Sequence, residues 1–590
     1  MESANSRIKT LSILAIIGLG FIVYSNSFFC SFHFDDDVYV INDFAIRNIH
    51  NLLDIGKVCP CRFITFLSLA LNYHFNGLNV FGYHLFNIAV HLGTSILVWW
   101  LILLTFSTPV IKKEKIARHK NSIALLAALI YVSHPVQIEA VTYIWQRAAS
   151  MTAFFYLLSL SLYVKSRLFQ DEKFPGAKKY YICSIITAVA AMFTKENAIT
   201  LPLMILLYEF SFLKTKKGID WGQLYPFWMI LFIIPLTMSL TRTSRVGEIQ
   251  SIVSGPHGIS PIHYFFTQLR VIITYMRLTV LPINLNLDYD YPIFRSFFEI
   301  PVLTSFIFLT AILYFAQRLF SKYRLISFSI FWFFLTLLPE SSILPQTDVI
   351  FEHRLYLPMV GYCIFLVSGA YYGTELFYRH SEPFASLEGR LREESKGALR
   401  SFVSLRMTML VLSTIIAFNS VLTYQRNKIW KNEIVLWADV IQKSPHKARP
   451  YINHGWAFYN QGDFTSSMAD YNKAITISPE LIYPYDDRGL IYARQGSLLK
   501  AIAEYTKAIK ISPYYPKVYY HRALAYFMQK NYPQALSDYN KAIELDGEYV
   551  DAYNDRAQLY ASQGNLTQAI ADYKKSIKID PNQPNIIAKF

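Results

Sequence analysis

Charged residues are scarce in this chain. Only 16% of its 590 residues are Asp, Glu, Lys or Arg, whereas 53% are hydrophobic. Soluble domains of ordinary composition carry about 25% charged residues. The shortage excludes an ordinary soluble protein and indicates a polytopic membrane protein, with the lipid bilayer as its main surroundings.

Cysteine is also scarce, since the chain has five, too scattered for a disulfide framework or a zinc site. Cys183 and Cys363 fall inside apolar runs and are expected to be packing residues. The other three lie in the segment 30–82. There, Cys30 can pair with Cys59 or with Cys61 if the segment faces an oxidising compartment.

The positive charge is placed as in membrane proteins. The formal net charge is +15, but Lys and Arg lie largely in short loops such as "IKKEKIARHK" and "LKTKKG". This is the positive-inside pattern, so we expect no nucleic-acid partner. The first apolar run is followed by the bulky "YSNSFFCSFHFDDD", which has no small-residue cleavage site. We interpret it as a retained first span.

Twelve apolar runs precede residue 423, at about 10–29, 84–106, 121–135, 150–165, 180–194, 198–213, 224–240, 264–283, 299–316, 325–339, 354–372 and 403–422. If 264–283 crossed, two basic loops would be forced outside, and it carries Arg270 and Arg277. We therefore expect it to re-enter or to lie in the interface. This predicts eleven crossings, with the N-terminus and loops 111–120, 166–179, 214–217 and 374–400 inside and the C-terminus outside. The membrane would be the inner membrane of a bacterium or the endoplasmic reticulum of a eukaryote.

The last 165 or so residues repeat every 34 positions. The repeated positions are Pro445, Pro479, Pro513, Gly547 and Pro581; Tyr471, Tyr505, Tyr539 and Tyr573; and Gly455, Gly489, Ala523 and Ala557. This is the tetratricopeptide signature, in which small residues lie where paired helices approach closely and Tyr fills the gap between them. We predict an all-α protein, with a polytopic helical domain over 1–423 and a tetratricopeptide α-solenoid over 424–590. Its repeats are expected at about 448–481, 482–515, 516–549 and 550–583.

Such solenoids usually bind peptide along a concave groove. Tyr485, Tyr519 and Tyr553 recur at the 34-residue step and are candidates for contacts with an acceptor polypeptide. Their spacing equally suits helix packing.

Four polar segments are expected on the outer side of the membrane, where each charge is costly and so suggests a site. They are 35–43 with Asp35, Asp36, Asp37, Asn42 and Asp43; 134–147 with His134, Glu139 and Arg147; 193–199 with Lys195 and Glu196; and 346–358 with Asp348, Glu352, His353 and Arg354. Singly, each could be a helix cap, an ion pair or a snorkelling side chain. Together, acids and cations under a membrane surface suit an anionic lipid-phosphate leaving group and a base that activates an acceptor.

Adjacent carboxylates limit the mechanism. Neighbouring side chains point about 100° apart on a helix and oppositely on a strand, so Asp35 and Asp36 do not readily flank one bond as a glycosidase pair does. One is expected to act and the other to support it, which favours a single displacement with one general base.

The chain resembles the transmembrane and tetratricopeptide-repeat O-mannosyltransferases and their bacterial relatives, which are polyprenyl-phosphate-sugar-dependent glycosyltransferases of the C-type (GT-C) fold. The similar stretches include "FHFDDDVYVIND", "HPVQIEAVTYIWQR", "FTKENAITLPLMILLYEF", "LPINLNLDYDYP" and "FEHRLYLPMVGYC", followed by the repeats. The resemblance implies transfer of a sugar, with inversion, from a polyprenyl- or dolichyl-phosphate carrier to Ser or Thr hydroxyls of a protein.

The resemblance also implies site residues. The family's acidic pair matches Asp35 and Asp36, although three consecutive Asp leave Asp36 with Asp37 as the other register. Other motifs match Glu139, Glu196 and Glu352, as well as Lys195 and Arg354, for which we expect contact with the donor phosphate. The identity of the sugar, mannose or another hexose, stays open, as does the use of a divalent cation such as Mg²⁺ or Mn²⁺.

Two other functions fit parts of the sequence. A membrane-anchored scaffold would use the repeats to assemble an envelope complex without catalysis, but it leaves Lys195, Glu196, Glu352 and Arg354 unexplained. A transporter of anionic solutes would explain charges within the membrane, but it predicts internal repeats in the membrane half, which the sequence does not display.

Overall fold

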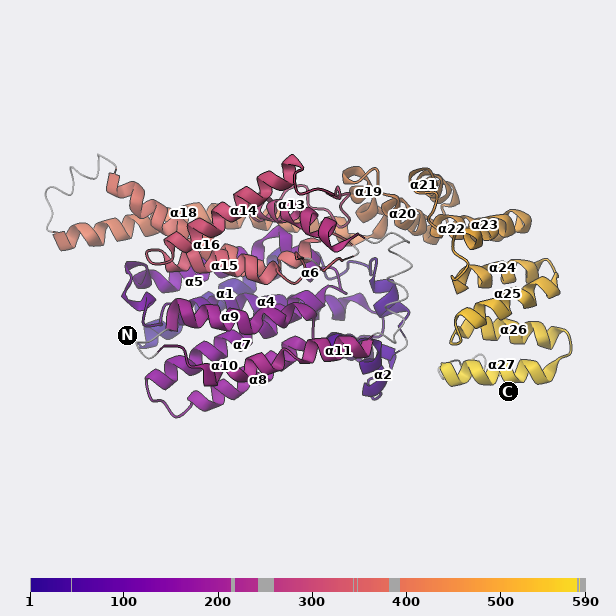
Figure 1. Cartoon of the computed structure of the whole chain (residues 1–590), viewed down its shortest axis with the longest axis horizontal. Helices are drawn as coiled ribbons and strands as arrows, with labels where there is room; N and C mark the ends of the chain where they lie inside the picture. Colours follow the sequence, from indigo (N-terminus) through magenta and orange to yellow (C-terminus); the bar gives the residue numbers. More distant parts are fainter. Residues whose placement is uncertain are drawn as a thin grey trace. The chain divides into compact units, whose positions relative to one another are not determined.

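The computed structural model describes residues 2–43, 45–213, 218–241, 259–342, 344–346, 348–380, 393–580 and 583. Every regular element that these residues form is a helix (Figure 1). The chain divides into two compact units, Met1–Lys431 and Asn432–Phe590. The basic loop 214–217 and much of 374–400, both predicted to lie inside, fall outside the described residues.

The first unit contains the apolar helices. They are α1 (Glu2–Tyr24), α2 (Leu52–Val58), α3 (Phe63–Asn76), α4 (Val80–Thr105), α5 (Lys120–Ser133), α6 (Ile138–Val141), α7 (Arg147–Asp171), α8 (Ala177–Met192), α9 (Leu201–Tyr208), α10 (Trp221–Ile230), α11 (Ile233–Thr241), α13 (Pro261–Val280), α14 (Ile300–Leu319), α15 (Arg324–Leu337), α16 (Pro358–His380) and α18 (Glu393–Asn427). Short helical turns that position polar residues are η1 (Asp37–Ile41), η3 (Pro60–Arg62), η7 (Glu196–Thr200), η8 (Glu209–Leu213) and η9 (Glu352–Leu355).

Each of the twelve apolar runs forms helix, as backbone surrounded by lipid must satisfy its own polar groups. Six described helical segments are long and apolar enough to cross a membrane: Ser6–Tyr24, Val80–Thr105, Arg147–Asp171, Glu196–Leu213, Ile300–Leu319 and Leu405–Lys431. A seventh results if Lys115–Ser133 and Pro135–Val141, bent by 54°, form one span. The 20-residue α13 is not among them. The predicted number of eleven crossings and their orientation stay predictions.

The segment 30–82 is more structured than a loop. It contains α2, η3 and the 14-residue α3, whose sequence "FITFLSLALNYHFN" buries Phe66 and Leu69. At about 1.5 Å per residue this helix is too short to span the bilayer, so its sequence does not stand out as a long apolar run.

The disulfide that the sequence allowed between Cys30 and Cys59 or Cys61 is not formed, and all five cysteines are free. Cys30 is buried, with its Sγ 4.0 Å from the backbone carbonyl oxygen of Asn427 in α18. Cys59 and Cys61 lie against each other instead, with their sulfur atoms 2.9 Å apart. Cys30 does not reach either of them, because α18, distant in sequence, packs over it.

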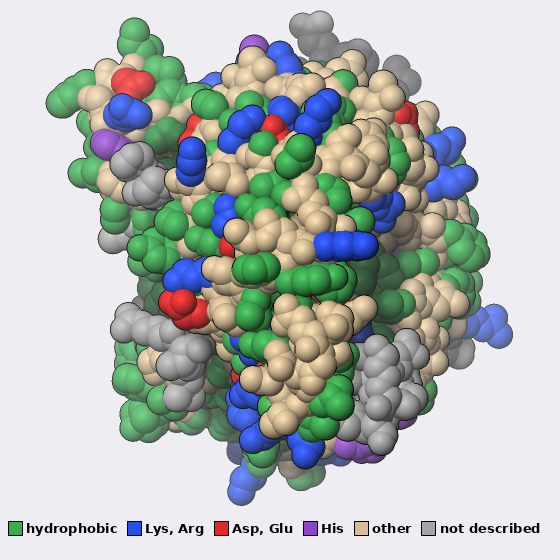
Figure 2. Space-filling view, turned by 90° about the vertical axis from the view of Figure 1, so that its right-hand side faces the viewer, with side chains coloured by type: hydrophobic (Ala, Val, Ile, Leu, Met, Phe, Trp, Pro, Cys, Tyr) green, Lys and Arg blue, Asp and Glu red, His purple; other side chains and the backbone are tan. Residues whose placement is uncertain are grey.

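The second unit is a series of helix pairs. Its helices are α19 (Glu433–Lys443), α20 (Ala448–Gln461), α21 (Phe464–Ile477), α22 (Tyr483–Arg494), α23 (Leu498–Ile511), α24 (Pro516–Met528), α25 (Tyr532–Leu545), α26 (Val550–Ser562) and α27 (Leu566–Ile579). Consecutive helices pack against each other along the series. Large hydrophobic side chains such as Leu499 also remain exposed. On the face of the molecule in Figure 2, hydrophobic side chains are interspersed with Lys and Arg.

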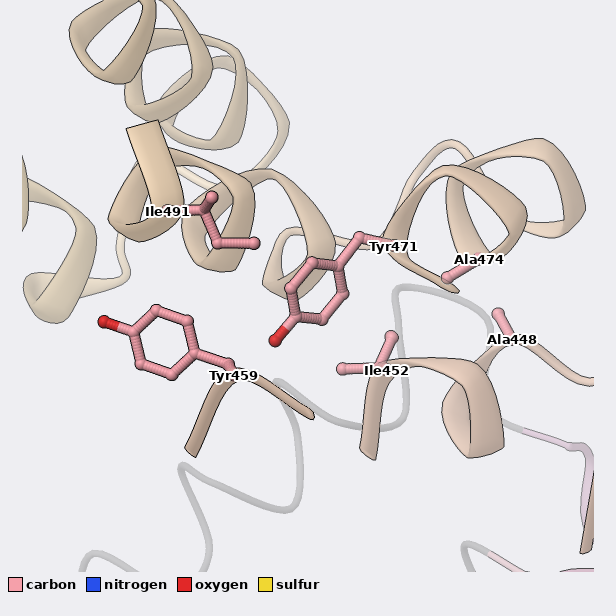
Figure 3. Packing of buried hydrophobic residues seen from close by; sticks show 6 residues of the cluster. All are labelled: Ala448, Ile452, Tyr459, Tyr471, Ala474 and Ile491. Carbon is pink, nitrogen blue, oxygen red and sulfur yellow. The ribbon is translucent and has the colours of Figure 1, made fainter. Parts of the chain in front are cut away.

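The predicted packing within the repeats is confirmed. A Cβ atom added to Gly455 would lie 2.8 Å from the ring of Tyr471, and one added to Gly489 would lie 2.4 Å from the ring of Tyr505. In Figure 3 the Tyr471 ring fills the space between helices beside Ile452 and Ile491. The small residue and the tyrosine therefore form one packing unit in each repeat.

Candidate active site

The acidic triplet begins with a strained turn. Phe34 has φ of 52°, in the left-handed region that residues other than glycine rarely adopt. The next residues carry their side chains into different surroundings. Asp36 is fully buried, whereas Asp35 and Asp37 are half-buried.

Asp36 holds the loop in place. Its Oδ2 accepts a hydrogen bond from the His33 backbone N–H (3.0 Å), and its Oδ1 accepts one from the Trp145 N–H (2.7 Å). Burial raises the pKa of Asp36 well above its ordinary value, against the effect of these two hydrogen bonds. Since both oxygens are occupied by backbone donors, Asp36 fixes the first polar segment to the second.

Asp35 lies next to the same junction. Its backbone N–H donates to the hydroxyl of Tyr143 (2.9 Å), and Tyr143 is itself buried. The backbone of Asp35 is thereby fixed while its half-buried carboxylate stays near the surface. Because this carboxylate is not fully buried, an acceptor hydroxyl can reach it.

The second polar segment also joins the fourth. Glu139 is buried, and its Oε1 lies 2.7 Å from Nδ1 of His353. Its Oε2 accepts the backbone N–H groups of Glu352 (2.8 Å) and His353 (3.2 Å). Burial, with Lys195 and Arg354 nearby, holds the pKa of His353 well below its ordinary value. The imidazole is therefore neutral near pH 7, and its Nδ1–H donates to Glu139.

Glu352 also accepts hydrogen bonds from another part of the chain. Its Oε1 accepts hydrogen bonds from the Asn286 backbone N–H and from the Tyr289 hydroxyl, both at 2.6 Å. The motif "LPINLNLDYDYP" thus packs onto the fourth segment through this carboxylate. Glu139 and Glu352 both serve as acceptors that hold chain segments together.

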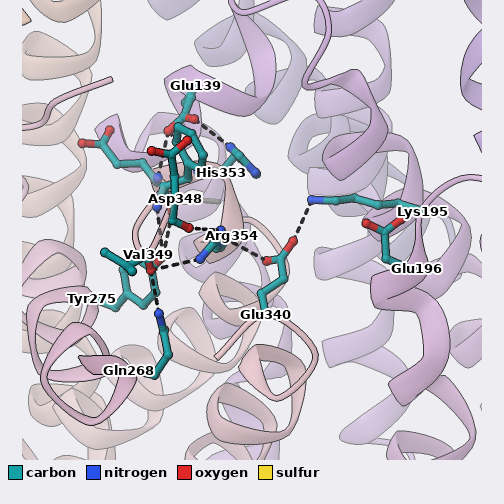
Figure 4. Close-up of polar contacts among 12 residues, drawn as sticks. Glu139, Lys195, Glu196, Gln268, Tyr275, Glu340, Asp348, Val349, His353 and Arg354 are labelled. Atoms are coloured by element: carbon teal, nitrogen blue, oxygen red, sulfur yellow. Dashed lines mark hydrogen bonds and ion pairs between the residues drawn. The ribbon is translucent and has the colours of Figure 1, made fainter. Parts of the chain in front are cut away.

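Two cations share one carboxylate at the other end of this network (Figure 4). Nζ of Lys195 lies 2.8 Å from Oε1 of Glu340, and Nε of Arg354 lies 3.9 Å from Oε2 of the same residue. Arg354 also donates to the backbone carbonyls of Val349 (3.0 Å) and Asp348 (2.7 Å). Burial alone would raise the pKa of Glu340, but Lys195 and Arg354 hold it below its usual range.

The third segment is also tied to 30–82. Arg62 donates to Glu196 with two nitrogens, at 3.2 and 2.6 Å. Its guanidinium lies 5.9 Å from the ring centre of Trp145, and that ring stacks on Tyr39 at 4.0 Å. Each of the four polar segments is therefore linked to another, and the links join segments predicted to share one face of the membrane.

Two predicted site residues lie outside this network. His134 places Nε2 3.0 Å from the Thr279 carbonyl oxygen, while its Nδ1 accepts from the Val136 N–H (3.3 Å). Arg147 is fully buried, donates to Asn72 (2.6 Å) and packs over the Phe86 ring. Both side chains hold helices together, as buried polar groups must find partners.

The three candidate tyrosines of the repeats have a structural contact in common. The hydroxyls of Tyr485, Tyr519 and Tyr553 donate to the backbone carbonyl six residues earlier, at 3.2, 3.2 and 3.4 Å. The accepting residue lies two positions after the end of the second helix of the preceding repeat in each case. This contact shapes the turn between repeats and gives the 34-residue spacing a reason independent of ligand binding.

The donor set for a metal ion is poor. Among the described residues, no group of three or more His, Cys, Asp or Glu side chains has the arrangement of a metal site. The Asp36 carboxylate already accepts two backbone hydrogen bonds, so Asp35 and Asp36 do not form an open pair of ligands. A divalent cation at this pair does not fit the contacts of the described residues.

Sequence reasoning missed Arg62, Tyr143, Trp145 and Glu340. Glu340 follows the apolar run "FFLTLLPE", so the criterion that selected the other charges, a carboxylate at the end of a span, could have found it. Arg62 lies before a helix too short to count as a span. Tyr143 and Trp145 carry no signal of their own, because aromatic residues make up 16% of the chain.

Comparison with known proteins matches both parts of the chain. Models of the TPR repeat match residues 455–496 and 489–530, and those of the tetratricopeptide repeat match 516–549 and 550–583. The crystal structure of MamA is similar over 27% of this chain and 90% of its own, at 19% identity and a TM-score of 0.23.

Relatives that match a larger part of this chain are named protein O-mannosyl-transferases. The chain is 22% identical over 523 residues to protein O-mannosyl-transferase TMTC3 of Mus musculus, covering 80% of this chain and 52% of the relative. It is 24% identical over 541 residues to Tmtc3 of Drosophila melanogaster, covering 79% and 55%. The chain thus spans about half the length of these curated relatives. It is a homologue of the transmembrane and tetratricopeptide-repeat O-mannosyltransferases that carries tetratricopeptide repeats at its C-terminal end.

Proposed function

We propose that this chain is a membrane glycosyltransferase that moves a hexose, mannose in the first instance, from a polyprenyl-phosphate carrier to Ser or Thr hydroxyls of proteins. The observation that carries the proposal is the linkage of the four polar segments into one network. The network has a half-buried carboxylate, Asp35, near one junction and two cations, Lys195 and Arg354, at another. The names of its relatives support the same activity.

The reaction is a single displacement. The acceptor hydroxyl oxygen attacks the anomeric carbon from the face opposite the phosphate, and its proton passes to the Asp35 carboxylate. The bond between the anomeric carbon and the phosphate oxygen breaks, and the lipid phosphate leaves with the electron pair. Lys195 and Arg354 stabilise the negative charge on the departing phosphate. Attack from the opposite face inverts the anomeric configuration.

Asp36 supports this step without touching the substrate. Its two hydrogen bonds hold the loop of Asp35 against Trp145, and the Tyr143 hydroxyl fixes the Asp35 backbone. A base held in this way loses little freedom when the acceptor arrives, which is how positioning contributes to rate.

The repeats would recruit the acceptor protein. In this proposal the N-terminus is cytoplasmic, while the four polar segments and the unit Asn432–Phe590 face the extracytoplasmic side, where acceptor and lipid-borne donor meet. Deleting this unit should weaken transfer to the natural acceptor and leave donor binding largely intact. Unchanged glycosylation by the truncated chain would refute recruitment.

Intact-mass analysis tests the activity in cells. Secreted and envelope proteins from cells with and without the gene product should differ by whole hexose units on Ser or Thr. Identical mass spectra, with the protein present at normal levels, would favour the membrane-anchored scaffold instead.

A further inference from the structure

Two cysteines lie side by side at the turn η3, one on each side of Pro60 in the sequence. The sulfur atoms of Cys59 and Cys61 are 2.9 Å apart. The backbone N–H of Arg62 donates to the Cys59 carbonyl oxygen at 2.9 Å, which closes the turn that carries the pair. A disulfide bond measures about 2.05 Å, so the two sulfur atoms need only a small approach to be bonded.

The pair differs from the other cysteines in its surroundings. Cys59 is 7% exposed and Cys61 is 8% exposed, whereas Cys30 and Cys363 are 0% exposed. Cys183 is half-buried in α8, within an apolar helix. Part of each residue of the pair is therefore at the surface, where a small reagent can approach.

The two thiols differ in acidity. The pKa of Cys59 is lowered because Cys61 donates a hydrogen bond to its sulfur and because the Arg62 guanidinium lies nearby, and together these effects outweigh burial. The pKa of Cys61 is raised by the same hydrogen bond and by burial. The thiolate is the nucleophile in thiol–disulfide exchange. Cys59 is therefore suited to attack a disulfide, and Cys61 to resolve the product.

The pair adjoins the network of polar segments. Arg62 follows Cys61 directly, and its side chain donates to Glu196 with two nitrogens, at 3.2 and 2.6 Å. Against the effect of burial, Glu196 and then Cys59 raise the pKa of Arg62, so both anions stabilise its guanidinium. Oxidation of the pair would remove the Cys59 thiolate and change the shape of the turn that holds Arg62.

We infer that Cys59 and Cys61 form a reversible dithiol–disulfide pair whose oxidation loosens the contact of Arg62 with Glu196. The oxidant is a small disulfide, for which oxidised glutathione is the probe. This redox chemistry goes beyond the proposed sugar transfer and does not depend on it. The pair encloses only one residue, and strained disulfides are the labile ones, so the bond should be readily reduced again.

The exchange takes place in two steps. The Cys59 thiolate attacks one sulfur of oxidised glutathione, and one glutathione leaves as a thiolate with the electron pair. The Cys61 thiol gives its proton to that thiolate, its sulfur attacks the Cys59 sulfur, and the second glutathione leaves and takes a proton from water. The products are the disulfide between Cys59 and Cys61 and two molecules of reduced glutathione.

Counting free thiols in the full-length protein in nanodiscs tests the redox pair. With excess reduced glutathione, all five cysteines should be alkylated after denaturation. With excess oxidised glutathione, two fewer should react, the protein should lose the mass of two hydrogen atoms, and the disulfide should map to residues 59–61. A return to reduced glutathione should restore all the thiols. Alkylation of all cysteines under oxidising conditions, or a disulfide that includes Cys183, would overturn the inference.

Single substitutions test the roles of the two thiols. Cys61→Ser should retain one glutathione on Cys59, because no second thiol displaces it. Cys59→Ser should take up glutathione about tenfold more slowly, because the remaining thiol is less ionised. Cys183→Ser is the matched control and should still lose two free thiols on oxidation. Equal uptake by Cys59→Ser and Cys61→Ser, or no uptake by Cys61→Ser, would contradict attack by Cys59.

Labelling of guanidinium groups with phenylglyoxal measures the effect on Arg62. Oxidation should increase the labelling of Arg62 about threefold or more, toward its level in Glu196→Gln, which lacks the partly exposed ion pair. Arg118, which is exposed on η5 (Lys115–His119), is the control and should be labelled equally in both states. Unchanged labelling of Arg62 once the disulfide has formed would overturn the coupling between the redox pair and this ion pair.

The outcomes also separate the redox pair from the proposed function, because neither measurement uses a sugar donor. A reversible disulfide and a more reactive Arg62 in a protein that transfers no sugar would keep the redox pair and reject the transferase. Sugar transfer by a protein in which oxidised glutathione leaves every cysteine free would keep the transferase and reject the redox pair.

Discussion

Glu340 gives the sharpest test of the proposed phosphate site, because its single carboxylate contacts both cations in the absence of a ligand. We predict that Glu340→Gln destabilises the unliganded protein yet strengthens its binding of lipid phosphate. The carboxylate is buried and contacts Lys195 at 2.8 Å and Arg354 at 3.9 Å. Removing one member of a buried ion pair typically costs about 3–5 kcal/mol, and glutamine retains one acceptor, so we expect a loss near about 3 kcal/mol.

Binding should change in the opposite direction. A phosphate between Lys195 and Arg354 lies close to the Glu340 carboxylate, and two unit negative charges 4 Å apart repel by about 4 kcal/mol at an effective dielectric constant of 20. Removal of this repulsion should lower the Kd for decaprenyl monophosphate about tenfold or more. The ligand should therefore raise the thermal midpoint of Glu340→Gln by more than that of the parent.

The pH dependence of stability gives a second result from the same variant. Lys195 and Arg354 hold the pKa of Glu340 below its usual range despite burial. A carboxylate with a lowered pKa in the folded state stabilises the fold above its unfolded pKa of about 4.3, and this stabilisation is lost as the pH falls further. The parent should lose more stability than Glu340→Gln below about pH 4.3.

The assay is thermal unfolding in nanodiscs with and without decaprenyl monophosphate, together with direct binding. Asp54→Asn is the control, because Asp54 forms an exposed ion pair with Lys57. An unliganded midpoint of Glu340→Gln equal to that of the parent would refute the ion-pair argument. Equal ligand-induced shifts in both proteins would show that the phosphate binds elsewhere.

Three further predictions concern other parts of the molecule. Gly489→Val should destabilise the repeats by about 1–3 kcal/mol, since a Cβ atom there lies 2.4 Å from the Tyr505 ring. Gly547→Val, at a position with nothing within 4 Å, should have little effect in the same denaturant titration, and equal losses would contradict the packing model. The lowered pKa of His353 means that its neutral form stabilises the fold above the unfolded pKa of about 6.5, so lowering the pH to 5.5 should cost about 1.4 kcal/mol. His353→Gln should lack this loss in thermal unfolding, and an identical pH profile would reject the assignment. A thiol introduced by Ser497→Cys should react with an impermeant reagent from outside and one introduced by Ser395→Cys should not; labelling of both, or the reverse pattern, would reject the predicted orientation.

The helices were largely predictable from the sequence because their signals are local. The length of an apolar run can be read directly from the sequence. The 34-residue period can also be read there, because each copy repeats the same residue types, as Gly489 and Tyr505 illustrate. Neither signal depends on which residues are in contact in the folded structure. The short helix α3 was not predicted, because its 14 residues are fewer than a membrane-spanning helix needs.

The sequence predicted the candidate site only as a set of charged residues whose placement near the membrane costs free energy. Ionisable side chains near the membrane are costly and therefore indicate a functional site. This criterion selected Asp35, Glu139, Lys195 and Arg354. Their partners were not predictable, since the contact of Lys195 with Glu340 joins residues 145 positions apart. Arg147 was assigned to the candidate site by the same criterion, although its contacts show a buried arginine that holds helices together.

The central claim is that Asp35 acts as the base in sugar transfer from a polyprenyl phosphate to a protein hydroxyl. The most direct test reconstitutes the full chain in liposomes with polyprenyl-phosphate mannose and its acceptor protein, and follows hexose addition by intact mass. Asp35→Asn keeps the size of the side chain but removes its basicity, so the rate should fall about 10²–10⁴-fold with normal membrane insertion. Asp37→Asn, also half-buried, is the matched control and should retain most of the parent rate. Transfer by Asp35→Asn at the parent rate would contradict the account, and loss confined to Asp37→Asn would move the base to that residue.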